Sequence, residues 1–511
     1  MNSPARFKNL LWHALPFAGC LVAASAHATT YTYRIPMGGL RATAAAPAAS
    51  VGVVFQDNTT GNPLPSIAFP DTKVGNSATI TVKIANTGTV DVTFDAPAFA
   101  SAAPFSIGTT DCSGTLVAAA SCTASVVFTP TAAQSFTGAL STNSDQSPAA
   151  SLSAAGTGLP GTTASEVIAG ESFTFARRTD GTWVASGDNG YGNLGLGATY
   201  QFYAFTAVPG LSGVTQITPG AYRTFARKSD GTWLGAGYNG DGGLGLGDKV
   251  NRTAFTPIPG LTGATKVVAG SFHTFAQMSD GSWWAAGLNS CGELGLGDTL
   301  TRTSFTKVTG LAGATQVAAS EQDTYAQMSD GSWRVAGCNG SGELGVGDYA
   351  RRNSLTVAPA LAGATQVVAN TYVAFARKAD GSWVAAGENS NGQLGTGDYD
   401  IHPTFTAVPG LTGATRVVAS GRHSFGQLAD GSWRGAGDNG NGQIGLGTFD
   451  WDYPTHTPVP VLAGATHLAV GKYYTVARQT DGLLWGAGQN SYGQLGRSST
   501  TNVRTFVPLS P

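Results

Sequence analysis

The chain has 511 residues, of which 11% are charged, 42% are hydrophobic and 71 are glycines, and its formal net charge at pH 7 is −2. A hydrophobic fraction of this size can fill a core, so the composition excludes a wholly disordered chain. Nucleic-acid-binding proteins carry an excess of positive charge, which this chain lacks, so no nucleic-acid partner is expected.

Residues 1–28 are organised like a secretory signal peptide. Arg6 and Lys8 supply positive charge, residues 10–26 are apolar, and Ala26-His27-Ala28 fits a cleavage site between small residues. A lipid anchor at Cys20 is the alternative, because Phe17-Ala18-Gly19-Cys20 resembles a bacterial lipoprotein box. Both alternatives predict a bacterial protein that is secreted or held in the cell envelope. No later stretch has ~18 consecutive apolar residues, so no membrane-spanning segment is expected.

The next two regions differ in composition and pattern. Residues 29–63 are rich in Ala, Pro, Thr and Gly and predict a flexible lead-in. Residues 64–160 contain several short runs in which apolar and polar residues alternate, as in half-buried strands, and the clearest are 78–84, 90–94 and 124–128. Several such runs at close spacing predict a β-sandwich.

This second region resembles immunoglobulin-like domains of the hydin and abnormal-spindle type. The matching segments are Ile84-Ala85-Asn86-Thr87-Gly88, Cys112 to Cys122, Val127-Phe128-Thr129-Pro130 and Ala155-Gly156-Thr157-Gly158. The resemblance implies an immunoglobulin-like β-sandwich, and in bacterial surface proteins such domains are usually spacers or adhesive modules.

Four cysteines remain after removal of residues 1–28, and an even number is typical of exported proteins with disulfides. Cys112 and Cys122 lie in the sandwich region, and Cys291 and Cys338 lie further along the chain. We therefore expect one bridge within each of these two pairs.

Residues 161–511 consist of seven repeats of about 50 residues, which determines the expected fold. An Asp-Gly pair marks each repeat: Asp180-Gly181, Asp230-Gly231, Asp280-Gly281, Asp330-Gly331, Asp380-Gly381, Asp430-Gly431 and Asp481-Gly482. In six repeats a tryptophan follows this glycine by two positions, whereas the seventh repeat has Leu484 there and Trp485 next.

Each repeat contains four short strand patterns, with the Asp-Gly pair as a two-residue hairpin turn between the third and the fourth. Four antiparallel strands per repeat predict an all-β protein with a seven-bladed β-propeller. The repeat region begins at Ala164 with a second-strand pattern and ends near Leu509 with a first-strand pattern. We therefore expect one blade to be split, with the C-terminal strand closing the ring against the three N-terminal strands.

The repeats resemble the regulator-of-chromosome-condensation family. The family run near Asn-x-x-Gly-Gln-Leu-Gly-x-Gly occurs at residues 389–397 and recurs at 189–197, 239–247 and 289–297. The sequence departs from the family pattern in two ways. The tryptophan has moved to the start of the last strand in six of the seven repeats, and the repeated histidine is kept only at His273 and His423. The family's founding member is a nuclear exchange factor for a small GTPase, and an exported chain is not expected to share that role.

Strand direction divides the loops between two faces of the expected ring. One face carries near-identical Pro-Gly-Leu and Asp-Gly turns, whereas the other carries loops that differ between repeats and use many aromatic residues and arginines. Such residues are enriched at binding hot spots, so we expect the variable face to bind a partner, although loop drift is the alternative. The expected partner-binding residues are Tyr200, Phe202, Tyr222, Arg223, Phe272, His273, Tyr372, Arg422, His423, Trp451, Tyr453, Tyr473 and Tyr474.

Several chemical sites are not expected. The glycine-rich runs lie between strands, so they predict turns and not phosphate-binding loops. The aspartates at 248, 298, 348 and 398 occur once per repeat, which predicts turn capping and not calcium binding. The histidines have no zinc spacing, and no nucleophile elbow or paired-carboxylate motif stands apart from the repeats. No metal, cofactor or enzymatic activity is therefore expected.

The sequence favours an exported, monomeric, non-enzymatic protein that binds another protein through its variable face. A propeller-type β-lactamase-inhibitory protein belongs to the family that the repeats resemble, so enzyme inhibition is one form of this hypothesis. Three alternatives remain: an adhesin or lectin for surface glycans, a hydrolase or lyase with a site at the ring centre, and a structural envelope protein without a specific ligand.

Overall fold

The computed structural model describes residues 52–511 except positions 75, 102, 132–133, 145–148, 160 and 450. The predicted signal peptide, Cys20 and most of the predicted lead-in lie outside the described residues. Within the described part of the chain the regular structure is almost entirely β, and no helix is long and apolar enough to cross a membrane.

Two sheets that share one core form the first unit. Buried Val82, Val126, Phe128, Leu140 and Leu152 pack in this core. Because Val53-Val54-Phe55 is apolar and pairs with the strand ending at Asn86, the lead-in predicted for 29–63 was too long at its C-terminal end. One sheet has the order β1 (Val53–Asp57), β4 (Ala78–Asn86), β8 (Ser121–Phe128), β6 (Phe105–Thr110). The other has the order β2 (Ser66–Ala68), β10 (Ser151–Leu159), β9 (Ser135–Ser144), β5 (Val92–Ala100), β7 (Gly114–Leu116), with β3 (Thr72–Lys73) beside β10.

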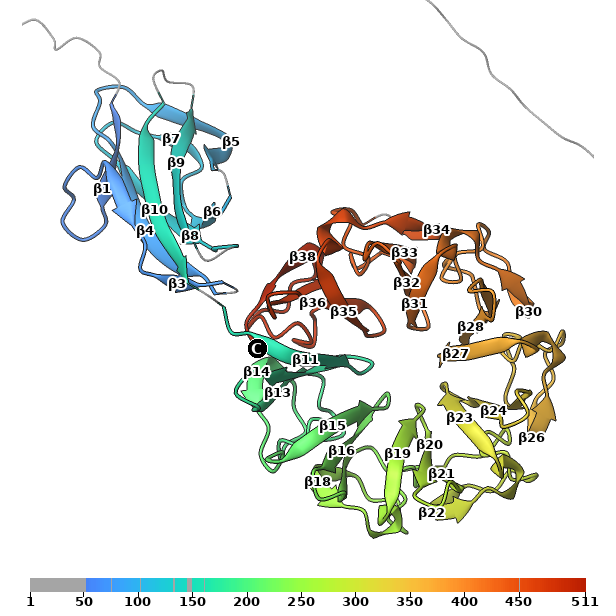
Figure 1. The fold of residues 1–511 in the computed structure, drawn as a ribbon. Helices are drawn as coiled ribbons and strands as arrows, with labels where there is room; N and C mark the ends of the chain where they lie inside the picture. The colour runs from blue at the N-terminus through green and yellow to red at the C-terminus, as the bar shows by residue number, and fades with distance from the viewer. Residues whose placement is uncertain are drawn as a thin grey trace, which may run out of the picture. The chain divides into compact units, whose positions relative to one another are not determined.

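Seven four-stranded antiparallel sheets follow in the described residues from Ala164 onward, and they are arranged around a ring (Figure 1). We call these sheets blades 1 to 7 in chain order. The strands of blades 1 to 4 are β11 (Ala164–Ala169), β12 (Phe173–Arg178), β13 (Trp183–Gly187), β14 (Phe202–Ala207); β15 (Val214–Pro219), β16 (Arg223–Lys228), β17 (Trp233–Gly237), β18 (Arg252–Pro257); β19 (Ala264–Ala269), β20 (His273–Met278), β21 (Trp283–Gly287), β22 (Arg302–Lys307); β23 (Ala314–Ala319), β24 (Asp323–Met328), β25 (Trp333–Gly337), β26 (Arg352–Val357).

The strands of blades 5 to 7 are β27 (Ala364–Asn370), β28 (Val373–Lys378), β29 (Trp383–Gly387), β30 (His402–Ala407); β31 (Ala414–Ala419), β32 (His423–Leu428), β33 (Trp433–Asp438), β34 (Asp452–Pro458); β35 (Ala465–Val470), β36 (Tyr474–Gln479), β37 (Leu484–Gly488), β38 (Val503–Leu509). Short 3-10 turns connect blade 2 to 3 and each later neighbouring pair: η1 (Pro259–Leu261), η2 (Thr309–Leu311), η3 (Pro359–Leu361), η4 (Pro409–Leu411) and η5 (Pro460–Leu462). The first strand of each blade lies at the centre of the ring (Figure 1).

The prediction of a split blade was wrong. The C-terminal strand β38 pairs with β37 of its own blade, and β11 to β14 form blade 1 without help from the C-terminus. The reason lies in the strand order: the strand expected to begin each repeat is instead the outer strand of the preceding blade. Each blade is therefore continuous in sequence, and the ring closes by packing of blade 7 against blade 1.

The repeated tryptophans join neighbouring blades. Each is buried at the start of a third strand, and its indole nitrogen donates a hydrogen bond to a backbone carbonyl at the start of the next blade. The donor–acceptor pairs, at 2.9–3.3 Å, are Trp183–Val214, Trp233–Ala264, Trp283–Ala314, Trp333–Ala364, Trp383–Ala414 and Trp433–Ala465. In blade 7 Leu484 cannot donate, and the equivalent carbonyl, that of Ala164, accepts from Arg478 Nε at 2.7 Å.

The Asp-Gly pairs lie in the predicted hairpins, although the turn is longer than expected. In blade 1 the backbone N–H of Arg178 donates to the carbonyl of Thr182, which leaves three residues in the loop. Gly181 has a φ of 86°, which a side chain would disfavour, and Asp180 Oδ1 accepts from the N–H of Thr182 at 2.8 Å. This is the hairpin type with a positive-φ glycine at its last loop position.

Both expected disulfides are present. Cys112 and Cys122 are joined with a Cα–Cα distance of 5.2 Å, and Cys291 and Cys338 with one of 4.9 Å. The second bridge connects the β21–β22 loop of blade 3 to the residue after β25 in blade 4. It therefore ties two neighbouring blades together covalently.

Replacing Cys291 and Cys338 together by serine is expected to lower the free energy of unfolding of the propeller by about 2–4 kcal/mol, because the bridge restricts the unfolded chain. Urea unfolding followed by tryptophan fluorescence would measure this loss, since the buried tryptophans belong to the blades. The matched control replaces Cys112 and Cys122, which lie outside the blades. An equal loss of propeller stability in both variants would contradict the expectation.

Candidate functional site

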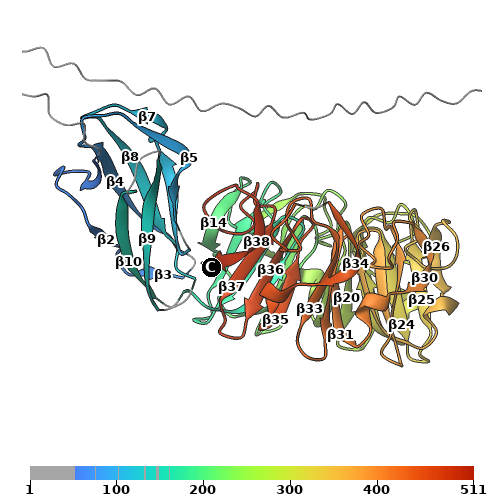
Figure 2. The same cartoon turned by 90° about the horizontal axis from the view of Figure 1, so that it is seen from above.

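One face of the ring, which we call the tip face, carries the turns between the first and second strands and the loops between the third and fourth. These connections share a face because antiparallel strands alternate in direction, and Figure 2 views the ring from its edge. The central residues of the seven turns are Glu171-Ser172, Ala221-Tyr222, Ser271-Phe272, Glu321-Gln322, Thr371-Tyr372, Gly421-Arg422 and Lys472-Tyr473. These positions vary between blades, in contrast to the buried tryptophans.

The turns of all seven blades surround a cavity of about 520 Å³ at the centre of the tip face. Its rim is polar and charged. Lys472 Nζ of blade 7 lies 2.6 Å from Glu171 Oε1 of blade 1, and the Tyr372 hydroxyl donates to Glu321 Oε1 at 3.4 Å. Arg422 also lines the cavity. The expected residues Tyr372 and Arg422 therefore share one site with two carboxylates that the sequence analysis did not select.

The carboxylates at the rim influence each other electrostatically. Burial raises the pKa of Glu321, and the negative charge of Glu171 raises it further. Burial also raises the pKa of the Tyr222 hydroxyl, with an added contribution from the neighbouring Glu171. Tyr222 therefore remains neutral at physiological pH, with its hydroxyl beside the Glu171 carboxylate of the rim.

A cluster of aromatic rings extends from this rim across blades 1 to 3. The ring centroid of Tyr191 lies 5.5 Å from that of Tyr222 and 5.0 Å from that of Tyr238, and Tyr222 lies 6.1 Å from Phe272. Tyr222 and Phe272 were expected at the site. Tyr191 and Tyr238 were missed, although they occur within and just before the Asn-x-x-Gly runs. Tyr238 differs there from every other repeat, and Tyr191 has a tyrosine counterpart only in the seventh repeat, Tyr492.

Other expected aromatic residues lie apart from this cluster on the tip-face loops. Trp451 is 81% exposed and Tyr200, which stacks on Phe202, is 63% exposed. Tyr473 is half-buried beneath Arg422, whose guanidinium carbon lies 5.2 Å from the ring centroid. Tyr453 is also half-buried. The tip face therefore presents several separate aromatic side chains and not one continuous patch.

Four of the expected partner-binding residues are buried, so their assignment was wrong: Arg223, His273, His423 and Tyr474. Each is the first residue of a second strand, and its side chain points into the propeller and not toward the tips. His423 Nε2 lies 2.9 Å from Thr475 Oγ1, and the Tyr474 hydroxyl donates to the Gly170 carbonyl, so these side chains connect neighbouring blades.

In blade 2 the first residue of the second strand is charged: it is Arg223. Its Nη2 lies 2.6 Å from Asp241 Oδ2, and both side chains are buried. A Cβ atom on Gly243 would lie 1.3 Å from Arg223 Nη1, so only glycine leaves room for this guanidinium. Most other blades have a glutamine or glutamate at that position. Arg223 is therefore accommodated by two other unusual residues of the same blade, Asp241 and Gly243. A buried position that varies together with its neighbours resembles a variable surface position in the sequence.

Buried carboxyl groups lie below the rim in blades 3 and 4. Asp323 and Glu343 are each 1% exposed, and burial together with the nearby Glu343 raises the pKa of Asp323 well above its usual range. Burial likewise raises the pKa of Glu293. Catalytic carboxylates must contact substrate, but these side chains are closed off from the cavity, whereas Glu321 lines it.

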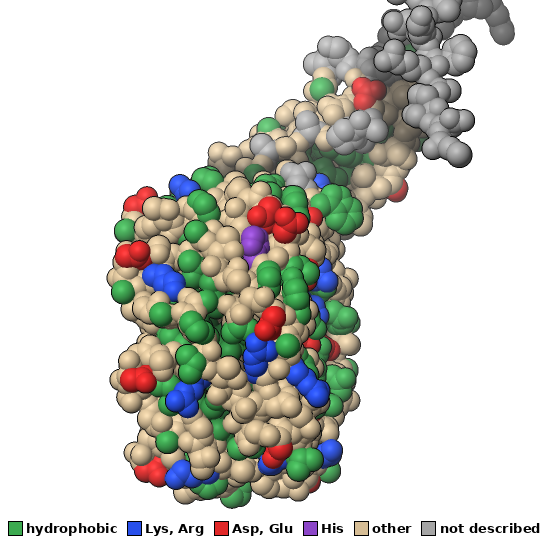
Figure 3. Space-filling view, turned by 90° about the vertical axis from the view of Figure 1, so that its right-hand side faces the viewer, with side chains coloured by type: hydrophobic (Ala, Val, Ile, Leu, Met, Phe, Trp, Pro, Cys, Tyr) green, Lys and Arg blue, Asp and Glu red, His purple; other side chains and the backbone are tan. Residues whose placement is uncertain are grey.

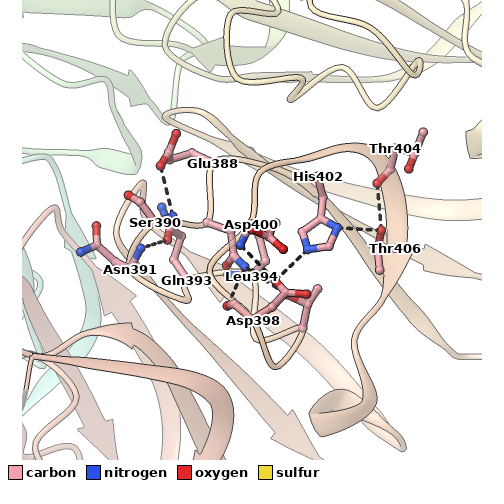
Figure 4. Close-up of polar contacts among 12 residues, drawn as sticks. Glu388, Ser390, Asn391, Gln393, Leu394, Asp398, Asp400, His402, Thr404 and Thr406 are labelled. Carbon is pink, nitrogen blue, oxygen red and sulfur yellow. Dashed lines mark hydrogen bonds and ion pairs between the residues drawn. The ribbon is translucent and has the colours of Figure 1, made fainter. Parts of the chain in front are cut away.

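The glycine-rich runs that resemble the family motif form loops that are held by hydrogen bonds within each loop. Figure 4 shows the loop of blade 5, where the backbone N–H of Asn391 donates to Gln393 Oε1 at 3.0 Å and Asp398 Oδ1 lies 2.9 Å from His402 Nε2. In blades 2 to 4 the equivalent aspartate pairs with an arginine four residues later, and the pairs are Asp248–Arg252, Asp298–Arg302 and Asp348–Arg352. These aspartates stabilise the loops, as the turn-capping prediction required.

Acidic and basic side chains are interspersed on the side of the ring shown in Figure 3, and neither sign gathers into a patch there. This distribution agrees with the small net charge of −2. A positively charged stripe of the kind that binds nucleic acid is not seen on that side.

The comparisons with known proteins agree with this architecture. No protein-family model and no curated protein matches the chain. Among solved structures, yeast RCC1 (Prp20) bound to Kap60 is similar with a TM-score of 0.58 and 16% identity, and the match covers 68% of this chain and 85% of that one. Prp20p from Saccharomyces cerevisiae, studied with Gsp1p and histones, gives the same TM-score and identity over 69% and 88% of the two chains.

Human WBSCR16 is similar with a TM-score of 0.57 and 18% identity, over 65% of this chain and 94% of that chain. Identities this low establish the fold alone. They confirm the predicted resemblance at that level: the repeat region of this chain is a β-propeller of the type found in the regulator of chromosome condensation.

Proposed function

We propose that this chain is an exported, non-enzymatic protein whose tip face binds a partner protein. The observation that carries the proposal is the tip face itself, where accessible aromatic side chains from several blades share one face with a charged cavity. Aromatic residues and arginine dominate binding hot spots, and aromatic rings bury a large area at a low cost in conformational entropy. The two disulfides support a location in an oxidising compartment.

The similar propellers lend support of a general kind. RCC1 (Prp20) forms a complex with Kap60, and Prp20p was characterised for binding to Gsp1p and histones. Those partners are not expected here, but they illustrate that this propeller type serves as a protein-binding scaffold. Binding to an enzyme, with inhibition as the outcome, is one form of the proposal. A catalytic role is disfavoured because Asp323 and Glu343 are buried.

A glycan ligand is the second candidate, and one observation favours it. Trp451 and Tyr200 are strongly exposed aromatic side chains on loops, and rings of this kind stack on sugars. A glycan would be displaced by free sugar, whereas a protein partner would not. Competition with free sugars therefore separates the two functions.

Capture experiments with a tip-face variant test the proposal. The variant combines Tyr191→Ala, Tyr200→Ala, Trp451→Ala and Tyr372→Asn, because all four side chains are exposed and Tyr372 has a φ of 59°, which asparagine tolerates. We expect the native chain to retain a protein from extracellular and envelope fractions, and the variant to bind it at least tenfold more weakly, as the loss of one or more hot spots would cause.

The control variant, Val357→Ala with Val461→Ala, removes exposed apolar side chains near the opposite face. It should retain the partner like the native chain. Equal retention by the native chain and the tip-face variant would contradict binding through the tip face. Release of the retained material by free sugar would favour the glycan alternative.

A further inference from the structure

A second cavity, of about 620 Å³, lies against the innermost strands of blades 7, 1 and 2. It is lined from β35 by His467, from β36 by Arg478 and from β11 by Glu166, among others. These strands surround the centre of the ring in Figure 1. Each of these innermost strands begins at the face opposite the tip face. The charged side chains of the cavity therefore lie toward that face and away from the aromatic cluster.

Two arginine side chains and one histidine side chain lie close together beside this cavity. Arg416 of blade 6 donates from Nη1 to His467 Nδ1 at 3.1 Å. Arg478 donates from Nε to the carbonyl of Ala164 and from Nη1 to Thr466 Oγ1 at 3.3 Å. All three side chains are half-buried. Two guanidinium groups from neighbouring blades therefore flank one imidazole.

Neither guanidinium is paired with a carboxylate among the described residues. The cation–carboxylate contacts found among those residues, from Arg223–Asp241 to Lys472–Glu171, involve other side chains. Glu166 also lines the cavity, but the cation that acts on it is Arg177 of its own blade. Removing a guanidinium partly from water without an opposite charge is costly, so a bound anion would offset that cost.

The hydrogen bond from Arg416 fixes the state of the histidine. Because Nδ1 accepts a hydrogen bond from the guanidinium, the neutral ring must carry its proton on Nε2. Burial, together with the neighbouring positive charges of Arg416 and Arg478, lowers the pKa of His467 to about 4. The ring is therefore a neutral N–H donor at physiological pH, positioned between two charged donors.

We propose that this cavity binds an oxyanion, with His467 and Arg478 of its lining as the groups that hold it and Arg416, which donates to His467, as the residue that positions the imidazole. Guanidinium groups form paired hydrogen bonds with carboxylate and with phosphate or sulfate oxygens, so these anions share the required chemistry. The site is separate from the tip face, and its occupancy does not depend on the proposed partner binding.

Titrations followed by NMR of the histidine ring signals test this inference in the full-length exported chain at pH 7. Sulfate, phosphate and acetate are added in separate experiments, with chloride at matched ionic strength as the reference. We expect a saturable shift of the His467 signal with at least one oxyanion. A tighter response to acetate assigns the natural ligand to carboxylates, and a tighter response to sulfate or phosphate assigns it to tetrahedral anions.

The variant Arg416→Gln should weaken this binding at least tenfold. Gln216, Gln316 and Gln366 occupy the same position in other blades, so the change introduces a residue that the fold already accepts. Arg416→Lys should retain part of the affinity, and the control Lys266→Gln removes a charge at the same repeat position of blade 3 without effect. No saturable shift beyond that with chloride, or equal affinity in Arg416→Gln, would overturn the proposal.

Discussion

Replacing Trp283 by alanine is expected to lower the free energy of unfolding by about 3–5 kcal/mol. Its ring is 1% exposed, packs in the core between blades 3 and 4, and donates to the Ala314 carbonyl at 3.0 Å. Alanine would remove this packing, leave a cavity and leave a buried carbonyl without its donor. The stability that is lost comes from the contact between blades 3 and 4 and not only from packing within blade 3.

The adjacent Trp284 provides a matched control. It is half-buried, and its indole nitrogen donates to Ser282 Oγ in the exposed hairpin and not to another blade. Trp284→Ala removes only a half-buried ring at the edge of the core between blades 2 and 3, so it should cost about 1 kcal/mol. Urea unfolding of both variants would measure the difference. Equal losses would show that the indole contact between blades is not a main source of stability.

The repeat period carried most of the fold information in the sequence. Seven Asp-Gly pairs and the tryptophans that follow them mark positions whose physical demands, a positive φ and a large buried ring, few residue types satisfy. The sequence could not show where one blade ends and the next begins, because a period is the same wherever counting starts. The split blade was an error of this kind, and strand pairing alone resolves it.

The candidate site was harder to predict for a physical reason. Variation between repeats reveals positions that are not fixed by the fold, but it does not distinguish a surface from an interior that has adapted locally. Arg223 with Asp241 and Gly243 is such an interior adaptation. Conversely, the rim carboxylates Glu171 and Glu321 are separated by 150 positions in sequence, and only the ring brings them to one cavity.

Three buried histidines are expected to make the propeller sensitive to acid. Burial lowers the pKa of His273, His423 and His456 to about 3 from an ordinary value of 6.5. The unfolded chain binds protons at these residues below pH 6.5, whereas the folded chain does not until pH approaches 3. The unfolded state is therefore favoured progressively as pH falls through this window, by about 2 kcal/mol per histidine at pH 5.

Buried carboxyl groups act in the opposite direction. The raised pKa of Asp323 means that the folded state takes up a proton before the unfolded state does, so its contribution to stability grows as pH falls. The total pH dependence thus combines both kinds of group. The contribution of one histidine is best isolated by replacing it and measuring how the slope of the free energy of unfolding against pH changes.

His456→Phe is suited to this measurement. The equivalent positions in five other blades are Phe205, Phe255, Phe305, Phe405 and Phe506, so the core already accommodates the ring. Between pH 6 and pH 5 the free energy of unfolding of the variant should fall less steeply than that of the native chain, by about 1.4 kcal/mol per pH unit, which corresponds to one proton. His423→Gln, which keeps polar contact with Thr475, should change the slope by a similar amount. Unchanged slopes in both variants would mean that these histidines are protonated in the folded chain, and the acid sensitivity would then have to arise elsewhere.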